Sequence, residues 1–175
     1  DNSVAPPGSV AAFDAAATNP DSAVLLYPYD QTVLPIGLAA PRIQWDPSGT
    51  SASAVKVSLR YPTTGPALFQ WSKILPESAP AAATVPPQIW ASFEQSAKGQ
   101  AAQFSVQRLI GGQPRLALSR TVNFATAAVR GKIYYTEYHR NRGQNEMVAD
   151  VASANAPRPA FGSSDGCPVC HTVSA

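Results

Sequence analysis

Apolar and polar residues alternate from Ala54 to Tyr61, and this alternation constrains the fold more than any other feature of the sequence. Valine and leucine at every second position are separated by lysine, serine and arginine. Alternate side chains of an extended chain point to opposite faces, so the run predicts a strand with one buried and one solvated face. A turn cluster at 63–66 separates it from the apolar run at 67–75, and together they predict a β-hairpin.

Short β-prone runs bounded by turn residues recur along most of the chain. They cover residues 23–27, 33–35, 41–45, 102–110, 115–123, 132–139 and 146–151. Several contain or adjoin one of the 17 prolines, which confines those strands to sheet edges or bends because proline lacks a backbone N–H. Many short strands with turn signals between them are typical of an antiparallel sandwich of immunoglobulin or fibronectin III type rather than a barrel. We therefore expect a mainly β fold.

One short helix is predicted at about 87–98. Pro87 stands at its first turn, apolar residues recur four apart from Ile89 to Ala97, and Gly99 can adopt the left-handed conformation that ends helices. The segments at either end of the chain differ in composition from this central part. Residues 1–22 are rich in Pro, Ala, Ser, Asn and Asp, and predict an extended leader or linker. We expect one β-sandwich domain at 23–151 and an irregular tail at 152–175.

Composition indicates an exported protein. Only 14% of the residues are charged, about half the usual share, and the net charge of +2 arises from charges scattered along the chain. Without a basic stripe, nucleic acid is not an expected partner. The longest apolar stretch is too short to span a membrane. A polar start at Asp1 is what removal of a signal sequence would leave, so we expect a periplasmic, extracellular or cell-surface location.

Both cysteines of the chain occur in one string near its end, Cys167-Pro168-Val169-Cys170-His171. This C-x-x-C-H spacing resembles the haem-attachment motif of c-type cytochromes. The resemblance implies a covalent haem c, with thioethers from Cys167 and Cys170 and with His171 as the proximal ligand of the iron. Attachment of this kind is made outside the cytoplasm, which agrees with an exported protein.

Other interpretations of the same string remain open. Cys167 and Cys170 could close a small disulfide, or they could be free thiols or part of a metal site. A structural zinc site usually needs four Cys or His ligands, and beyond these cysteines the chain offers only His171 and the distant His139. A disulfide would also favour an oxidising compartment.

The sixth iron position has two candidate ligands within this chain. Met147 is the only methionine, and His139 is the only histidine besides His171. Methionine would raise the reduction potential relative to histidine. Met147 is equally compatible with a strand core and His139 with an exposed strand end. A ligand from a neighbouring molecule and an open site are the remaining possibilities.

The string and the residues after it, Cys-Pro-Val-Cys-His-Thr-Val-Ser, are similar to segments of large exported bacterial surface proteins, in which they lead into propeller-like repeats. That resemblance implies a preceding sandwich module and a role in surface display or redox chemistry at the cell envelope. In the cytochrome c family, a helical domain follows the motif, whereas here only residues 172–175 follow. Either the haem packs on a β-domain or a partner subunit, or the chain is the front piece of a longer polypeptide.

We therefore expect an envelope protein for electron transfer or haem-mediated assembly, whose partners are other envelope proteins or copies of itself. The alternative is a non-enzymatic structural or adhesion module with a Cys167–Cys170 disulfide. Catalysis is not expected, because no G-x-S-x-G elbow occurs and most of the 11 carboxylates are predicted to be solvated. A carbohydrate-binding module is a third hypothesis, resting on tryptophans and tyrosines of which most are predicted to lie in the core.

Overall fold

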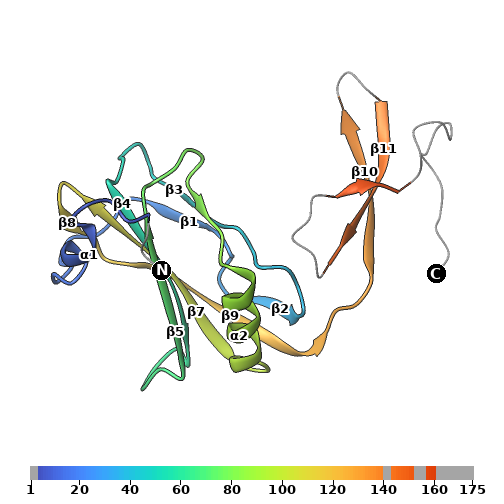
Figure 1. Cartoon of the computed structure of the whole chain (residues 1–175), viewed down its shortest axis with the longest axis horizontal. Coiled ribbons are helices and arrows are strands. Elements are labelled where there is room, and N and C mark those ends of the chain that lie inside the picture. Colours follow the sequence, from blue (N-terminus) through green and yellow to red (C-terminus); the bar gives the residue numbers. More distant parts are fainter. Residues whose placement is uncertain (1–3, 140–142, 152–156, 161–175) are drawn as a thin grey trace. The chain divides into compact units, whose positions relative to one another are not determined.

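The computed structural model describes residues 4–139, 143–151 and 157–160, and divides the chain into two compact units (Figure 1). The first unit contains residues 1–36 and 40–127, and the second contains 37–39 and 128–175. The single domain predicted at 23–151 spans parts of both units. Among the described residues, the strands after residue 131 pair with one another.

A six-stranded sheet forms the centre of the first unit. Its strand order is β2-β9-β7-β4-β5, and β8 pairs with β7 outside this path. The bounds are β2 Thr32–Ile36, β4 Ala54–Tyr61, β5 Phe69–Leu75, β7 Ala101–Ile110, β8 Gln113–Pro114 and β9 Leu118–Ala128. The predicted hairpin is confirmed, because β4 and β5 pair antiparallel with Tyr61 opposite Phe69. The run at 102–110 likewise turns at Gly111 and Gly112 and returns as β9, antiparallel to β7.

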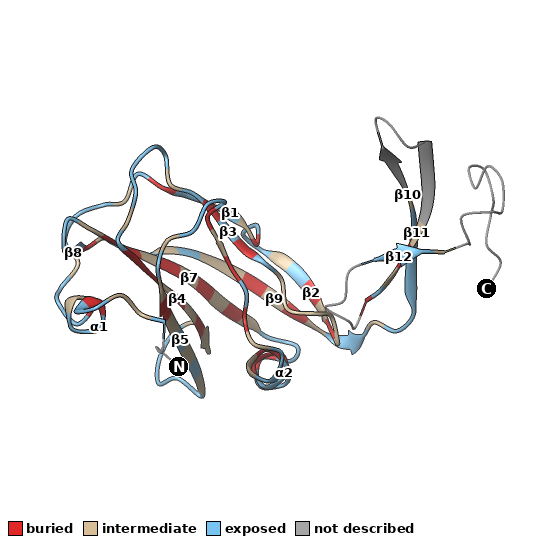
Figure 2. Ribbon diagram, turned by 45° about the horizontal axis from the view of Figure 1, so that its top comes forward, coloured by how far each residue is buried: buried red, intermediate tan, exposed pale blue. Residues whose placement is uncertain are grey.

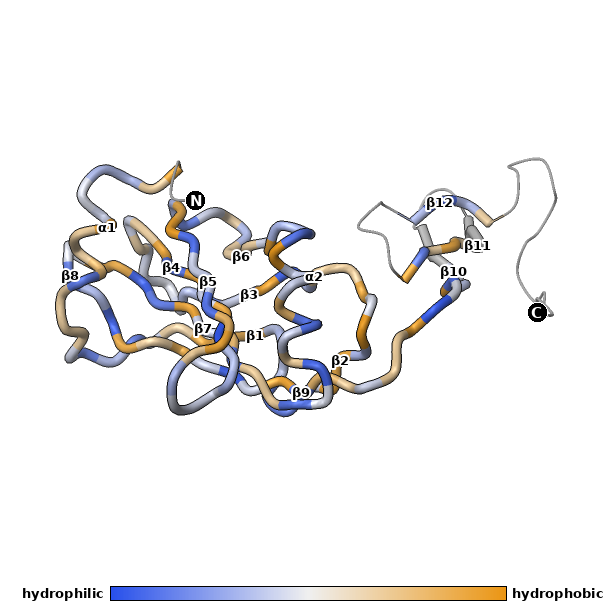
Figure 3. The backbone as a smooth tube through the Cα atoms, turned by 60° about the horizontal axis from the view of Figure 1, so that its bottom comes forward, coloured by the Kyte–Doolittle hydropathy of each residue, from blue (hydrophilic) through white to orange (hydrophobic). Residues whose placement is uncertain are grey.

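A smaller sheet buries one of its faces. It consists of β1 Val24–Tyr27, β3 Ile43–Asp46 and β6 Ala82–Ala83, in the order β1-β3-β6. Leu25, Ile43 and Trp45 are buried, while their neighbours along the strands are exposed (Figure 2). Apolar and polar residues alternate in the same way along β7 of the large sheet (Figure 3). Each sheet therefore contributes one apolar face to the core, as in a sandwich.

The predicted helix is confirmed as α2, Pro87–Ser96, with proline in its first turn. Trp90 and Phe93 are buried, and their rings lie 5.4 to 6.1 Å from those of Phe104 and Phe124 on β7 and β9. Gly99 follows at φ 73°, the left-handed conformation that glycine adopts most readily. The helix forms because its apolar side packs on an aromatic cluster of the large sheet.

The N-terminal segment packs against the domain, which differs from the extended leader expected at 1–22. It contains the four-residue helix α1, Ser9–Ala12, followed by the buried Phe13. Phe13 packs in a cluster with Ala54, Ile74 and Leu109, and the Lys56 ammonium lies 5.2 Å from the centre of its ring. Phe13 is the large apolar anchor of this segment, and the N–H of Leu116 donates to the carbonyl of Asn19 at 2.8 Å, so the segment is also bonded to the sheet further along.

The second unit contains a three-stranded antiparallel sheet. Its strands are β10 Lys132–His139, β11 Gly143–Asp150 and β12 Arg158–Pro159, in the order β10-β11-β12. The backbone N–H of Ala39 donates to the carbonyl of Val151 at 3.1 Å, and Val148 and Val151 are buried. The strand expected at 146–151 begins earlier, at Gly143, because β10 and β11 pair along eight residues.

The mainly β class predicted from the sequence is confirmed. The registered strand pairs are antiparallel, two helices accompany them, and the described strands close no barrel. This architecture is consistent with a β-sandwich. In the described part of the chain, no helix is long and apolar enough to cross a membrane.

Candidate functional site

The residues predicted to hold haem, Cys167, Cys170 and His171, lie outside the described residues. The two candidates for the sixth ligand belong to the second unit. Met147 is a half-buried residue of β11 and stands opposite Tyr135 in the register. His139 is the last residue of β10, four residues beyond Tyr135. At about 3.3 Å per residue, the backbone of His139 lies about 13 Å along β10 from the residue opposite Met147.

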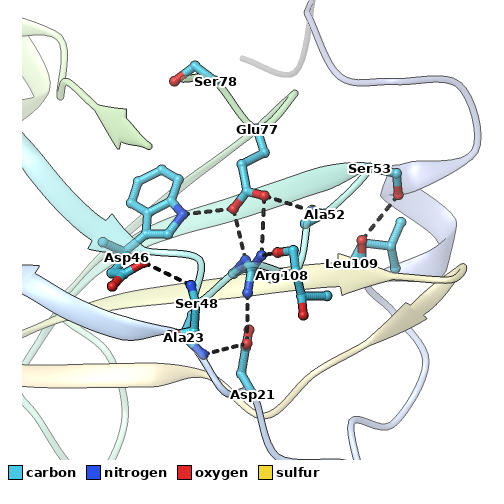
Figure 4. A network of polar contacts seen from close by, with 12 residues as sticks. Asp21, Ala23, Asp46, Ser48, Ala52, Ser53, Glu77, Ser78, Arg108 and Leu109 are labelled. Carbon is cyan, nitrogen blue, oxygen red and sulfur yellow. Dashed lines mark hydrogen bonds and ion pairs between the residues drawn. The ribbon is translucent and has the colours of Figure 1, made fainter. Parts of the chain in front are cut away.

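In the first unit, the structure brings together a buried charged cluster that sequence reasoning missed (Figure 4). Arg108 on β7 is fully buried. Its Nη1 donates to Oδ1 of Asp21 and its Nε to Oε1 of Glu77, each at 2.8 Å. Its Nη2 donates to Oε2 of Glu77 at 3.2 Å and to the carbonyl oxygen of Thr50. Each nitrogen of the guanidinium therefore has an acceptor.

Further donors surround the two carboxylates of the cluster. The indole N–H of Trp45 donates to Oε1 of Glu77 at 2.8 Å, and the backbone N–H of Ala52 donates to its Oε2 at 2.7 Å. The backbone N–H of Ala23 donates to Oδ1 of Asp21 at 3.0 Å. The cluster thus connects β7 with β3, with the loop between β3 and β4, and with the segments before β1 and after β5.

The carboxylates of this cluster are buried, and the hydrogen bonds to Glu77 favour its ionised form. The side chain of Asp21 is 0% exposed and that of Glu77 is 7% exposed. Burial raises the pKa of Glu77, but hydrogen bonds from Arg108, Trp45 and Ala52, together with the Arg108 charge, outweigh burial and hold that pKa below its ordinary value. Oδ2 of Asp21 is buried and has no hydrogen-bond partner among the described residues.

The geometry of the cluster suits a structural role. It contains neither cysteine nor histidine, and the charges of Arg108, Glu77 and Asp21 are engaged with one another. Within the described ranges, no three or more His, Cys, Asp or Glu side chains gather where they could hold a metal ion. The cluster therefore fixes the segments between strands, as buried charges do when their hydrogen bonds are made within the protein.

One sequence signal could have revealed the cluster. Ala102, Phe104 and Val106 face the core at every second position of β7, and Arg108 continues this alternation. A charged residue at an inward position needs a buried counter-charge. The prediction that most carboxylates are solvated did not single out Asp21 and Glu77, which are exceptions to it. Asp21 and Glu77 lie in irregular segments, where no strand or helix periodicity indicates which side chains are buried.

The aromatic residues divide between core and surface. Trp45 and Trp90 are buried and Trp71 is half-buried, in agreement with the predicted core position of the tryptophans. The tyrosines Tyr29, Tyr134 and Tyr135 are exposed instead, and Tyr29 is the most exposed of the three, with 70% of its surface accessible. Its ring meets that of Tyr27 edge-on, with 5.7 Å between the ring centres. An exposed, supported ring of this kind is available for contact with a ligand.

The chain was compared with family models, with curated proteins and with solved structures. None of them matches it. Its function is therefore inferred from the chain's own residues.

Proposed function

We propose that this chain is an exported cell-envelope protein that binds one covalent c-type haem and serves electron transfer or haem-mediated assembly. The observation that carries the proposal is the string Cys167-Pro168-Val169-Cys170-His171, which holds both cysteines of the chain beside a histidine. The low content of charged residues supports an exported location. Other envelope proteins or further copies of this chain are the proposed partners.

The donor set has the chemistry that haem c requires. Two thiols can form thioethers with the vinyl groups of the porphyrin, and the imidazole of His171 can ligate the iron. When bound, the haem would supply an iron centre that gains and loses one electron. Met147 and His139 are the proposed alternatives for the sixth ligand. A donor from a partner and an open position are the others.

Intact mass and a pyridine haemochrome spectrum, both on protein purified from its native source, test this proposal. Covalent haem adds about 616 Da and leaves a Soret band that survives denaturation. The matched variant Cys167→Ala/Cys170→Ala should have neither the added mass nor the band. A native protein whose mass is that of the apo chain, or two hydrogens less, would contradict the haem proposal.

A second function, a structural or adhesion module of a surface assembly, is favoured by a different observation. Ile133, Tyr134 and Tyr135 are exposed in succession along β10, which is an edge strand of its sheet. Apolar side chains on an unpaired edge promote association with another chain. This proposal includes a Cys167–Cys170 disulfide. Non-reducing mass spectrometry would detect the bond, and sedimentation of Tyr134→Lys beside the parent chain would test association through β10.

A further inference from the structure

The turn between β1 and β2 holds an aromatic ring in solvent. Tyr29 follows the buried Pro28, and 70% of its surface is exposed. The ring of Tyr27 meets it at an interplanar angle of 85°, so an edge contact supports one side of the exposed ring. The ring of Tyr29 is therefore held in one place and remains largely open to a ligand.

Hydrogen bonds fix the backbone of this turn. The backbone N–H and the hydroxyl of Thr32 both donate to the carbonyl of Tyr29, at 3.3 and 2.8 Å. The turn is also bonded to β9, since the N–H of Thr121 donates to Oδ1 of Asp30 at 2.8 Å and the N–H of Gln31 donates to the carbonyl of Thr121 at 2.7 Å. A ligand that contacts Tyr29 would therefore meet a preorganised surface, and its binding would require little ordering of the chain.

Gln31 adopts a strained conformation in the same turn. Its φ is 63°, in the left-handed region that residues with a side chain rarely occupy. Its Oε1 accepts a hydrogen bond from Nδ2 of Asn123 at 3.1 Å. Glycine would adopt this backbone without strain, yet the chain places an amide here. Strain of this kind concentrates at binding sites, where the surrounding structure holds a side chain in a required position.

Two polar residues follow Tyr29 in the turn. Asp30 and Gln31 are both exposed, and in the described part of the chain no hydrogen bond uses Oδ2 of Asp30 or Nε2 of Gln31. These atoms are a carboxylate acceptor and an amide donor. The positively charged residue next to Thr121 on β9 is Arg120, and its guanidinium donates to the carbonyls of Ser119 and Leu25. The surface therefore combines one aromatic ring with neutral and acidic hydrogen-bonding groups and lacks a concentration of positive charge.

We propose that the turn at 28–32 is a binding site for a neutral carbohydrate chain. The apolar C–H face of a pyranose would stack on Tyr29, while its hydroxyls would donate to Asp30 and accept from Gln31. A protein partner would need about 800 Å² of complementary surface on this chain, and the polar residues beside the ring do not supply an apolar interface core. This proposal is independent of haem, because its residues all belong to the first unit.

Native affinity electrophoresis of the full chain tests the site. The gels would contain laminarin, xylan, galactomannan or dextran, and the variants would be Tyr29→Ala, Gln31→Gly and the control Leu68→Ala, which removes another large exposed apolar side chain of the first unit. At least one polysaccharide should retard the parent chain. Tyr29→Ala should weaken this retardation about tenfold, the scale of one lost aromatic contact. Gln31→Gly should weaken it while relieving the backbone strain, and Leu68→Ala should leave it unchanged.

Thermal unfolding of each variant separates lost binding from lost folding. Glycine suits a φ of 63°, so reduced retardation of Gln31→Gly without any loss of stability supports the site even if Tyr29→Ala unfolds. Absence of retardation in every gel would overturn the proposal, as would equal loss in Tyr29→Ala and Leu68→Ala. Self-association that depends on Tyr29, without retardation by any polysaccharide, would assign the turn to a protein partner and would also overturn it.

Discussion

Replacement of Arg108 by methionine tests whether the buried cluster stabilises the first unit. Methionine occupies a similar length but cannot donate a hydrogen bond, so Asp21 and Glu77 would lose the ion pairs that hold them at 2.8 Å. Breaking a buried ion pair by removing one partner costs about 3–5 kcal/mol, because the remaining charge is buried without compensation. A domain of this size is stable by about 5–15 kcal/mol, so Arg108→Met should remove a large share of its stability.

Urea denaturation followed by tryptophan fluorescence measures this loss. With a denaturant slope of about 2 kcal/mol per M, a loss of about 4 kcal/mol lowers the midpoint by about 2 M. Trp45 is a local reporter because its indole donates to Glu77. The control is Arg42→Met, which alters an exposed arginine and should change the free energy of unfolding by less than about 0.5 kcal/mol.

The pH dependence of Arg108→Met gives a second readout. Burial raises the pKa of Glu77, and the hydrogen bonds from Arg108 are the strongest effect that lowers it. Without the guanidinium, the pKa of Glu77 should therefore rise, and this carboxylate should take up a proton more readily. The destabilisation should therefore shrink as the pH falls from about 7 to about 5. If Arg108→Met lowers the free energy of unfolding at neutral pH by less than about 1 kcal/mol, no more than the exposed control Arg42→Met does, the inference that the cluster is a stabilising buried network is refuted.

Three further predictions concern single side chains of the first unit. The pKa of Glu77 is lowered in the folded state, so ionised Glu77 stabilises the fold fully above about pH 4.3, and this contribution is lost as the pH falls through the lowered pKa. Glu77→Gln should therefore flatten the decline of the free energy of unfolding in acid. Phe13→Ala should cost about 3–5 kcal/mol in urea unfolding if the N-terminal segment packs as described, and a cost near zero would show that it does not. Gly99→Ala should destabilise more than Gly111→Ala in thermal unfolding. Both glycines have positive φ, but only at Gly99 would a Cβ approach a side chain, Cγ2 of Thr126, at 2.9 Å, and equal shifts in melting temperature would contradict this steric argument.

Local pattern was sufficient to predict much of the secondary structure. The alternation at 54–61 predicted β4 with the observed bounds, and the turn at 63–66 predicted its pairing with β5. The helix at 87–98 was predicted by spacing, proline and Gly99. These elements share one property: their signals lie within about ten residues of one another, where periodicity is informative.

Contacts between distant residues could not be predicted in the same way. Asp21, Glu77 and Arg108 are separated by 31 or more positions in the sequence, and the carboxylates lie in irregular segments. Phe13 packs against Ala54, Ile74 and Leu109, which belong to three different strands of the large sheet. This contact, like the division of the chain into two units after residue 127, depends on which strands pair. Period-two patterns identify strands but do not select their partners.

The sequence by itself determined that this chain is mainly β, where its clearest strand and its main helix lie, and that its cysteines share a C-x-x-C-H string, because these are properties of neighbouring residues. Only the tertiary structure decided which polar residues are buried and which aromatic rings are exposed. Arg108 is inside the core and Tyr29 is in solvent, the reverse of what their side chains alone would favour. Burial depends on what packs against a residue from elsewhere in the chain, and that information is absent from local spacing.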